Sequence, residues 1–269
     1  MAQQLLVRSS DGTPISSESH GEGRPLVVVS GALFGSDRWL PVVPRLTIGR
    51  RVLIIDRRGR GKSGDTLPYA PEREVEDILA VLANLAGPVD LFGHSSGAIL
   101  ALQAAARVPP NLARLIAYEP PVFFRDEDRI APDLPERLDA LLAKGDRNAA
   151  VQTFLREGPR VAEREIAGMA ASGFWPQLLA AQGHTVPYDS RVQRSFNAGP
   201  DELARIRVRS LMLLGGASPE RMKAGAQTVA ARLPNAELKE LPGQQHVAQL
   251  SAPELFASAV NEFLAGALS

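Results

Sequence analysis

Three short runs of large aliphatic residues constrain the fold of this chain more than any other feature. They are Leu26–Ser30, Val52–Asp56 and Val89–Gly93, and each ends at a serine, an aspartate or a glycine. Continuous apolar runs of this length are typical of strands that are buried on both faces of a parallel sheet. The runs therefore predict a sheet that is covered by helices on both sides.

Helical patterns fill the intervals between these runs. Apolar residues between positions 75 and 85 follow the i, i+3, i+4 spacing of one helix face, and the Ala-rich stretch 96–107 ends before two prolines. An Asp-Gly pair at 11–12, between two short extended runs, predicts a β-hairpin. Further strands are predicted at 115–118, 210–214 and 236–241, and further helices at 222–233 and 255–264. This alternation predicts an α/β protein with a doubly wound, mostly parallel sheet.

Residues 121–205 break the alternation. They contain helical patterns, such as those around Leu138 and Phe154, and no convincing strand. We expect this stretch to form a helical cap inserted at the carboxyl edge of the sheet, where open α/β sheets bind ligands. Residues 1–120 and 206–269 would then form the core around the sheet.

Charge and cysteine content exclude several classes of protein. Thirty basic and thirty acidic side chains give a formal net charge of zero, so no global field attracts nucleic acid or an anionic membrane. The absence of cysteine removes disulfides, a thiol nucleophile and thiolate metal sites. The first residues lack a signal-peptide pattern, and no run approaches the ~18 apolar residues of a membrane span. We therefore expect a cytoplasmic protein.

Two nucleotide-binding patterns occur only in part. Gly59, Gly61 and Gly64 have the G-x-G-x-x-G spacing, but Pro68 predicts a loop where that fingerprint requires a helix. Gly61 also opens a G-K-S run like the end of a P-loop, but the first P-loop glycine would fall at Asp56. The histidines are too scattered for a metal site. We expect neither a cofactor nor a metal.

The strongest chemical signal is Gly93–Gly97, which spells G-H-S-S-G between a predicted strand and a predicted helix. In this context the pattern is typical of a nucleophile elbow. The two glycines permit a tight turn, and the helix N-terminus favours negative charge that develops beside the serine. The motif therefore predicts Ser95 as a nucleophile.

A serine nucleophile needs a general base, and the chain has four histidines. His246 follows the last predicted strand, in a loop that would lie over the same edge of the sheet as Ser95. His20 lies in an N-terminal loop, His184 lies in the insertion, and the elbow turns the side chain of His94 away from Ser95. We therefore predict His246 as the base.

These features give the chain a resemblance to the α/β-hydrolase superfamily over nearly its whole length. Ser30-Gly31-Ala32 follows one predicted strand and the glycine-rich loop 56–63 follows the next; the elbow, the cap and His246 come in the family's order. Members usually carry histidine where Ser30 stands. The resemblance implies that the backbone N–H groups of Ala32 and Ser96 form an oxyanion hole, which the side chain of Ser30 need not affect.

The triad acid departs from the family's common pattern. An aspartate usually follows the penultimate strand in a Gly-x-x-Asp-Pro run, but residues 215–219 spell G-G-A-S-P and Ser218 takes its place. Glu220 is one alternative. Glu119 is the other, because haloalkane dehalogenases and the zearalenone lactonase type carry a triad glutamate after the corresponding strand. A glutamate at that strand end can also contact the His246 loop, so we favour Glu119.

The resemblance implies a serine hydrolase that cleaves a small apolar carboxylic ester or lactone with water, on a Ser95-His246-Glu119 triad. A lyase, an isomerase, a C–C bond hydrolase and a small-molecule receptor are the alternatives. Candidate substrate contacts are Gly31, Leu33, Phe34 and His94 in the core and Phe123, Phe124, Phe174, Trp175, His184 and Tyr188 in the cap. The sequence indicates neither the natural substrate nor the oligomeric state.

Overall fold

One eight-stranded sheet forms the centre of the protein, which the computed structural model describes over residues 3–196 and 199–266. The strand order is β1-β2-β4-β3-β5-β6-β7-β8, and from β4 to β8 all neighbours are parallel. β1 pairs antiparallel with β2, and β2 pairs antiparallel with β4. The strands are β1 (Gln3–Arg8), β2 (Pro14–Gly21), β3 (Arg24–Val29), β4 (Arg50–Ile55), β5 (Val89–His94), β6 (Leu112–Tyr118), β7 (Arg209–Gly215) and β8 (Ala236–Leu241). The predicted doubly wound, mostly parallel sheet is confirmed.

The central strands divide their aliphatic side chains between the two faces of the sheet. Val27 and Val29 of β3 belong to one buried cluster, whereas Leu26 and Val28 belong to the other. Successive strand residues point to opposite faces, so a strand buried on both faces must be apolar at every position. This requirement explains why the predicted strands appear as unbroken aliphatic runs.

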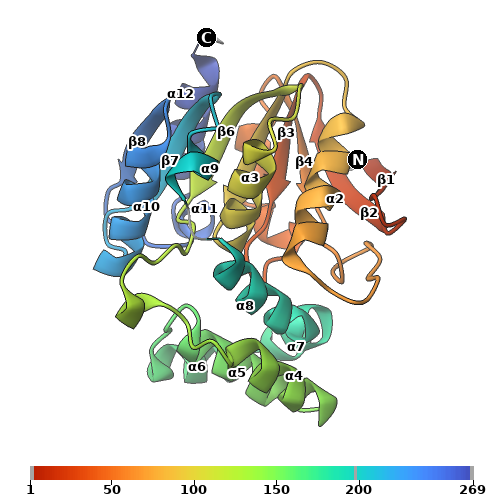
Figure 1. Ribbon diagram of the computed structural model, residues 1–269, viewed down its shortest axis with the longest axis vertical. Helices are drawn as coiled ribbons and strands as arrows, with labels where there is room; N and C mark the ends of the chain where they lie inside the picture. The colour runs from red at the N-terminus through yellow and green to blue at the C-terminus, as the bar shows by residue number, and fades with distance from the viewer. Residues whose placement is uncertain (1–2, 197–198, 267–269) are drawn as a thin grey trace.

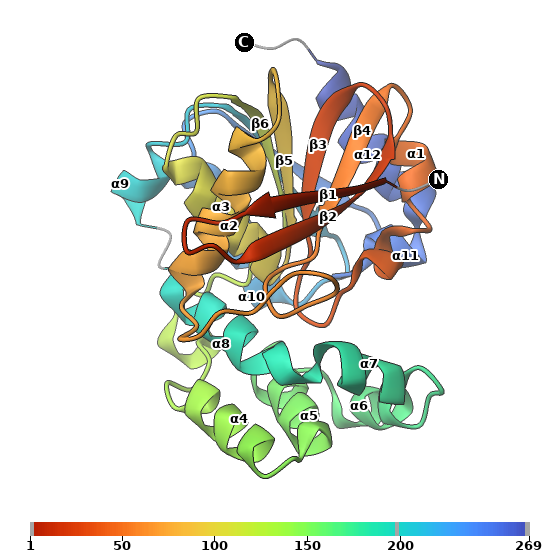
Figure 2. The same ribbon diagram turned by 90° about the vertical axis from the view of Figure 1, so that its right-hand side faces the viewer.

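Helices cover both faces, and Figure 2 shows the resulting layers nearly edge-on. One face is covered by α2 (Pro71–Ala83), α3 (Ser96–Ala106), α10 (Glu220–Arg232) and the short α9 (Pro200–Leu203). The other face is covered by α1 (Val43–Leu46) and α12 (Pro253–Ala265), with α11 (Ala248–Ser251) just before α12 and the 3₁₀ helix η1 (Ser36–Trp39) nearby. The βαβ crossovers bring the carboxyl ends of the parallel strands to one edge.

A separate group of helices lies beyond that edge, at the bottom of Figure 1. It contains α4 (Leu134–Ala143), α5 (Arg147–Glu157), α6 (Glu163–Ala170), α7 (Trp175–Gln182), α8 (Val186–Ser195) and the 3₁₀ helices η2 (Asp126–Asp128) and η3 (Gly183–Thr185). These helices, called the cap below, share a hydrophobic cluster that includes Leu138, Phe154 and Trp175, and Leu33 of the core inserts into it. α9, near the end of the predicted 121–205 insertion, contacts α3 and α10 instead. The boundary at residue 205 stays a prediction.

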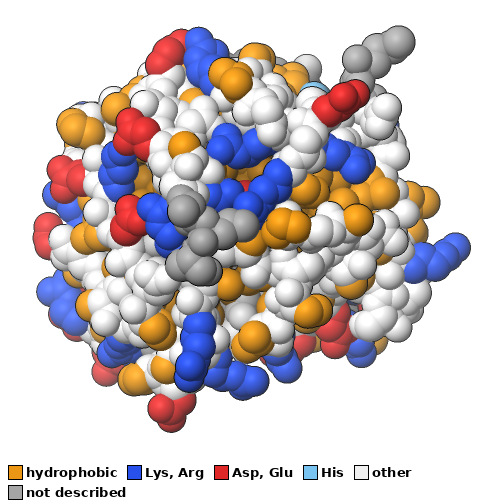
Figure 3. All heavy atoms as spheres, turned by 90° about the horizontal axis from the view of Figure 1, so that it is seen from above, with side chains coloured by type: hydrophobic (Ala, Val, Ile, Leu, Met, Phe, Trp, Pro, Cys, Tyr) orange, Lys and Arg blue, Asp and Glu red, His pale blue; other side chains and the backbone are white. Residues whose placement is uncertain are grey.

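The end of the molecule opposite the cap carries a mixture of charges. Figure 3 shows Lys and Arg side chains near the middle of this face, with hydrophobic side chains between them. Asp90 of β5 is buried and accepts hydrogen bonds from Arg24 of β3 at 2.7 Å and from Arg114 of β6 at 2.9 Å. These ion pairs tie three neighbouring strands together, far from the carboxyl edge. In the part of the chain that the structure describes, no helix is long and apolar enough to cross a membrane.

Candidate active site

Ser95 occupies a strained turn between β5 and α3. Its φ of 56° and ψ of −127° are unusual for a residue with a side chain, and such conformations persist only where the surrounding structure enforces them. A Cβ on Gly93 would lie 2.5 Å from the carbonyl oxygen of Gly97, and a Cβ on Gly97 would lie 2.3 Å from that of Val29. Both positions therefore require glycine, and the predicted strand–turn–helix context of Ser95 is present.

Glu119 contacts His246 at the same edge of the sheet. It follows β6, is fully buried, and its Oε2 lies 2.6 Å from Nδ1 of His246. Its Oε1 accepts a hydrogen bond from the backbone N–H of Gly215 at 2.7 Å. Burial raises the pKa of Glu119, but the contact with His246 and the Gly215 N–H outweigh it and hold that pKa below its usual value. The carboxylate therefore stays ionised beside the imidazole.

Ser218 and Glu220 lie after β7, where the family's usual aspartate would stand. The buried Ser218 hydroxyl is near enough to Glu119 to favour its ionised form, although it does not meet the geometry of a hydrogen bond. Glu220 is exposed and is the first residue of α10. Of the two glutamates weighed from the sequence, Glu119 is the one in contact with His246.

The loop that carries His246 is fixed from beneath by two aromatic residues. Tyr118 donates its hydroxyl proton to the carbonyl of Gln245 and accepts from the N–H of Ala248 at 3.2 Å. His94 donates from Nε2 to the carbonyl of His246 at 2.8 Å. Burial and the neighbouring His246 lower the pKa of His94 well below its usual value, so this ring is neutral. His94, a candidate substrate contact from the sequence, is a support of the loop, and the role of Tyr118 was not anticipated.

Ser95 and His246 line one small, largely apolar cavity of about 180 Å³. The core also contributes Ala32, Leu33, Phe34 and Arg38, and the cap side contributes Phe154, Leu155, Pro159, Val161, Met169, Phe174, Leu178 and Gln193. Within the described residues no hydrogen bond joins Ser95 to His246. Catalytic hydrogen bonds are often long without substrate and tighten when it binds, so this geometry is compatible with a serine–histidine pair.

The predicted oxyanion-hole residues flank Ser95. Ala32 lines the cavity, and Ser96 is the first residue of α3. Gly31 lies close to Ser95, since a Cβ at this position would lie 2.7 Å from the Cβ of Ser95. Gly31 therefore permits a close approach of backbone to nucleophile, and the following residues of the same loop line the cavity.

Several aromatic and histidine side chains predicted as substrate contacts lie elsewhere. Trp175 is buried in the cap cluster and donates to Asn148 at 2.8 Å, and Phe124 packs against the sheet core. His184 bonds to the carbonyl of Gly59 at 2.7 Å, and Tyr188 stacks on Tyr69 with 3.8 Å between ring centroids. These four side chains are structural contacts because they fill the interior of the cap or join it to the core. Of the candidates, Leu33, Phe34 and Phe174 line the cavity.

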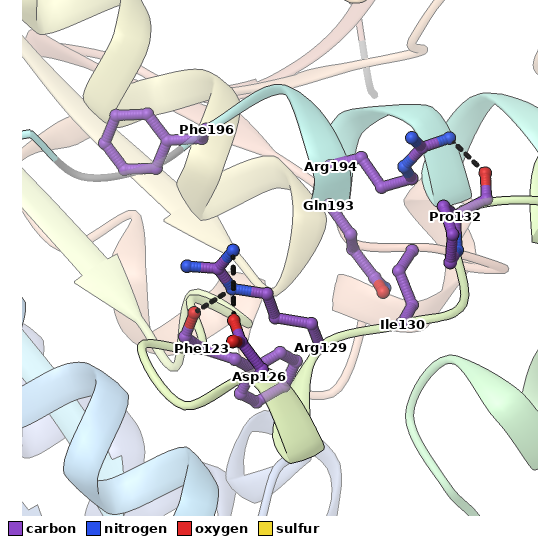
Figure 4. Close-up of a pocket in the computed structure, with 8 residues that line it drawn as sticks. All are labelled: Phe123, Asp126, Arg129, Ile130, Pro132, Gln193, Arg194 and Phe196. Carbon is purple, nitrogen blue, oxygen red and sulfur yellow. Dashed lines mark hydrogen bonds and ion pairs between the residues drawn. The ribbon is translucent and has the colours of Figure 1, made fainter.

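Phe123 lines a second cavity of about 410 Å³, shown in Figure 4. This cavity adjoins the first at Gln193, which belongs to both linings. Its charged groups are partnered locally: Arg129 lies 3.4 Å from a carboxylate oxygen of Asp126, and Arg194 donates to the carbonyl of Pro132. None of Ser95, His246 and Glu119 is among the residues that line this second cavity.

A buried network of charges joins the cap to the elbow. Asp189 of α8 is fully buried and accepts hydrogen bonds from Arg57 and Arg60, each at 2.7 Å, and from the Ser96 hydroxyl at 2.9 Å. Arg57 also donates to Glu74 at 2.6 Å. Burial raises the pKa of Asp189, but the two arginines hold it below its usual value. Arg57 and Arg60 belong to the glycine-rich loop 56–63, and no sequence pattern indicated their connection to Asp189.

No group of three or more His, Asp or Glu side chains in the described residues is arranged to hold a metal ion. The expectation that no cofactor is needed stays a prediction.

Comparison with known proteins agrees with this geometry. Residues 26–259 match the family model of the alpha/beta hydrolase family, and the chain belongs to that family. A crystal structure of an alpha/beta hydrolase from Sphaerobacter thermophilus is 41% identical, with a TM-score of 0.88 over 97% of this chain and 100% of that one. A putative carbamate hydrolase, RutD, from Caulobacter vibrioides is 28% identical over 98% of this chain and 100% of its own length.

A third relative, the N-formylmaleamate deformylase of Pseudomonas putida, is 35% identical, but over only 45% of this chain and 46% of that protein. A pimeloyl-[acyl-carrier protein] methyl ester esterase of Aeromonas hydrophila is 28% identical over 93% of this chain and 99% of its own. The chain is thus similar to hydrolases named for different bonds. These relatives support a hydrolase without deciding which bond it cleaves.

Proposed function

We propose that this protein is a serine hydrolase of carboxylic esters or lactones. The observation that carries the proposal is the convergence of Ser95, on its strained turn, and His246, held by Glu119, on one apolar cavity. The hydrolase relatives and the family membership support it further. A carbamate or an amide is the nearest competing substrate class, since relatives are named for them.

In the proposed mechanism, Ser95 attacks the substrate carbonyl carbon while His246 accepts the hydroxyl proton at Nε2. Glu119 orients the imidazole through Nδ1 and stabilises the imidazolium. The backbone N–H groups of Ala32 and Ser96 bind the oxyanion. The tetrahedral intermediate collapses as His246 protonates the leaving alcohol, and the acyl group remains on Ser95.

Deacylation reverses these roles. A water molecule gives a proton to His246 and attacks the acyl carbonyl, and the returning proton restores the Ser95 hydroxyl as the carboxylic acid leaves. Substrate and water are then the reactants, in a cavity that holds a small acyl group. Neither a cytoplasmic location nor an oligomeric state enters this proposal.

The test is turnover of p-nitrophenyl acetate, p-nitrophenyl butyrate and small lactones by the purified chain. We expect multiple turnovers for wild type and a loss of several orders of magnitude for Ser95→Ala, with the melting temperature nearly unchanged. A fluorophosphonate probe is expected to label Ser95. Activity of Ser95→Ala within a few-fold of wild type would remove Ser95 from the mechanism, and single turnover with tight product binding would favour a receptor.

A further inference from the structure

The cavity at Ser95 contains one permanently charged side chain. Arg38, from the 3₁₀ helix η1, is among the residues that line it. Apart from the proposed triad members Ser95 and His246, the only other polar side chain in that lining is Gln193, which is neutral. Arg38 is therefore the one permanent cation in a largely apolar lining.

Arg38 has no counter-ion in the part of the chain that the structure describes. Its buried Nε has no hydrogen-bond acceptor, and no carboxylate lies within 4.0 Å of its side-chain nitrogens. The neighbouring Asp37 directs Oδ1 toward Gly35, where a Cβ would lie 2.6 Å from that oxygen. Glu119 is engaged by His246 and Gly215. Arg57, by contrast, is paired with Glu74 and Asp189.

Two phenyl rings hold the Arg38 guanidinium in place. Its central carbon lies 5.3 Å from the ring centroid of Phe34 and 4.9 Å from that of Phe174. Phe34 belongs to the core and Phe174 to the cap, so both sides of the site fix this group. Cation–π contacts occupy the faces of a guanidinium and leave its N–H edges available for a planar anion.

We propose that Arg38 binds a carboxylate of the substrate, so that the preferred substrates are small esters or lactones that carry a second, ionised carboxyl group. A planar carboxylate matches the guanidinium fork and would accept from two of its N–H groups together. It would also supply the negative charge that a partly buried cation otherwise lacks. The proposal rests on the proposed function and names the substrate class of the same site.

Gln193 adds a second polar group to the lining of the cavity. Its Oε1 is buried and has no hydrogen-bond partner among the described residues. The rest of the lining is largely apolar, which suits an apolar substrate chain. The cavity of about 180 Å³ limits that chain to a few carbons.

The test measures binding without turnover, in the Ser95→Ala protein. The ligands are glutarate monomethyl ester and its neutral counterpart of equal shape, methyl 4-carbamoylbutanoate, with the succinate and adipate pairs to vary the length. We expect the acid to bind at least about tenfold more tightly than the amide for one of the three lengths, because charged hydrogen bonds contribute about tenfold or more to affinity. Calorimetry gives both dissociation constants.

A second substitution assigns that preference to Arg38. In Ser95→Ala/Arg38→Gln the ratio of the two dissociation constants is expected to fall to within about threefold of one. The matched control is Ser95→Ala/Arg164→Gln, which removes an exposed arginine of α6 and is expected to retain the preference. Inorganic phosphate, titrated in parallel, is expected to bind more weakly than the acid.

The proposal is overturned if neither member of any pair binds, if acid and amide bind equally, or if Arg38→Gln leaves the preference intact. Phosphate that binds more tightly than every acid would overturn the assignment to carboxylates. A purely structural arginine predicts equal losses for acid and amide. If the acids show no preferred binding but p-nitrophenyl esters are still turned over, only the carboxylate proposal is rejected. If the Arg38-dependent preference is present but the chain hydrolyses no ester, only the proposed function is rejected.

Discussion

The two walls of the cavity are built in different ways. On the core wall, main-chain conformation at strand ends places the important groups: Ser95 has a φ of 56°, Glu119 a φ of 46° and Leu33 a φ of 59°. On the cap wall, side chains such as Phe154 and Met169 project from helices and are placed only by packing among themselves. The core wall therefore carries the proposed reactive groups, and the cap wall carries most of the apolar surface.

This difference between main-chain placement and side-chain packing predicts which substitutions change the chemistry and which change the choice of substrate. A sheet edge is rigid because hydrogen-bonded neighbours and two buried faces hold it, so a group there is positioned closely enough for proton transfer. Side chains of the cap helices can be substituted without a shift of Ser95. We therefore expect core-wall changes to lower kcat and cap-wall changes to alter the ranking of substrates.

The largest expected effect lies on the core wall. Glu119→Gln keeps the shape of the side chain but removes the charge that stabilises the imidazolium, and it favours the wrong tautomer of His246. We predict a loss in kcat of at least about a hundredfold, and the equivalent change in another serine triad costs about 10⁴. Steady-state kinetics on a p-nitrophenyl ester measures it.

Glu220→Gln is the matched control for that prediction. Its carboxylate is exposed at the start of α10, and we expect kcat to change by less than about threefold. If Glu220→Gln caused the larger loss, the acid would be assigned to the loop after β7, and the core wall would not be built as described.

Two adjacent cap residues test the second wall. Trp175→Ala empties a buried position of the cap cluster and is expected to lower the free energy of unfolding by about 3–5 kcal/mol. Phe174→Ala removes a side chain that is 38% exposed and lines the cavity, so it is expected to change the ranking of short and long acyl esters with a smaller loss of stability. Denaturant unfolding and an ester series separate the two effects. An unchanged ranking in Phe174→Ala would mean that this residue is structural too.

The junction between the two walls depends on a buried carboxylate. Asp189→Asn removes the negative charge between Arg57 and Arg60, and we expect the free energy of unfolding to fall by about 3 kcal/mol. Asp139→Asn of α4 is the control, because Asp139 pairs with Arg191 of α8, the helix that also carries Asp189. This ion pair is partly exposed and contributes less than about 1 kcal/mol. Equal effects of the two substitutions would mean that the network does not stabilise the junction of cap and core.

The smallest effect concerns the pH dependence of the core wall. The pKa of His94 is lowered in the folded protein, chiefly by burial, so the unfolded chain binds a proton near pH 6.5 that the folded chain does not. Stability is therefore unaffected above about pH 6.5 and falls as the pH drops below it. We expect a lower melting temperature at pH 5.5 than at pH 7.5, and a smaller difference between these two pH values in His94→Gln.

The lowered pKa values of Glu119 and Asp189 act at more acidic pH, because stability from an ionised carboxylate is lost only as the pH falls through its folded pKa. His184 also has a lowered pKa and contributes in the same direction as His94. The difference in melting temperature is therefore expected to shrink in His94→Gln without disappearing. An identical difference in wild type and variant would contradict the role assigned to burial at His94.

Sequence patterns were sufficient where local structure decides the outcome. The aliphatic runs at 26–30, 52–56 and 89–93 became central strands because residues buried on both faces must be apolar throughout. The elbow at Ser95 was predictable because Gly93 and Gly97 leave no room for a Cβ. Aromatic residues in the cap were harder to assign, because a helical layer needs large side chains for its own interior and only packing shows which of them face the cavity.

By itself, then, the sequence determined the sheet, the turn at Ser95 and two candidate acids for His246. Only the tertiary structure brought one of those candidates into contact with His246, since Glu119 and His246 are 127 residues apart and meet through the pairing of β6 with β7 and of β7 with β8. It also decided that Arg38 lacks a counter-ion while Arg57 has two. Both arginines look alike in a sequence, because the charge belongs to the residue itself. Whether a carboxylate lies beside that charge depends on which parts of the chain fold against it.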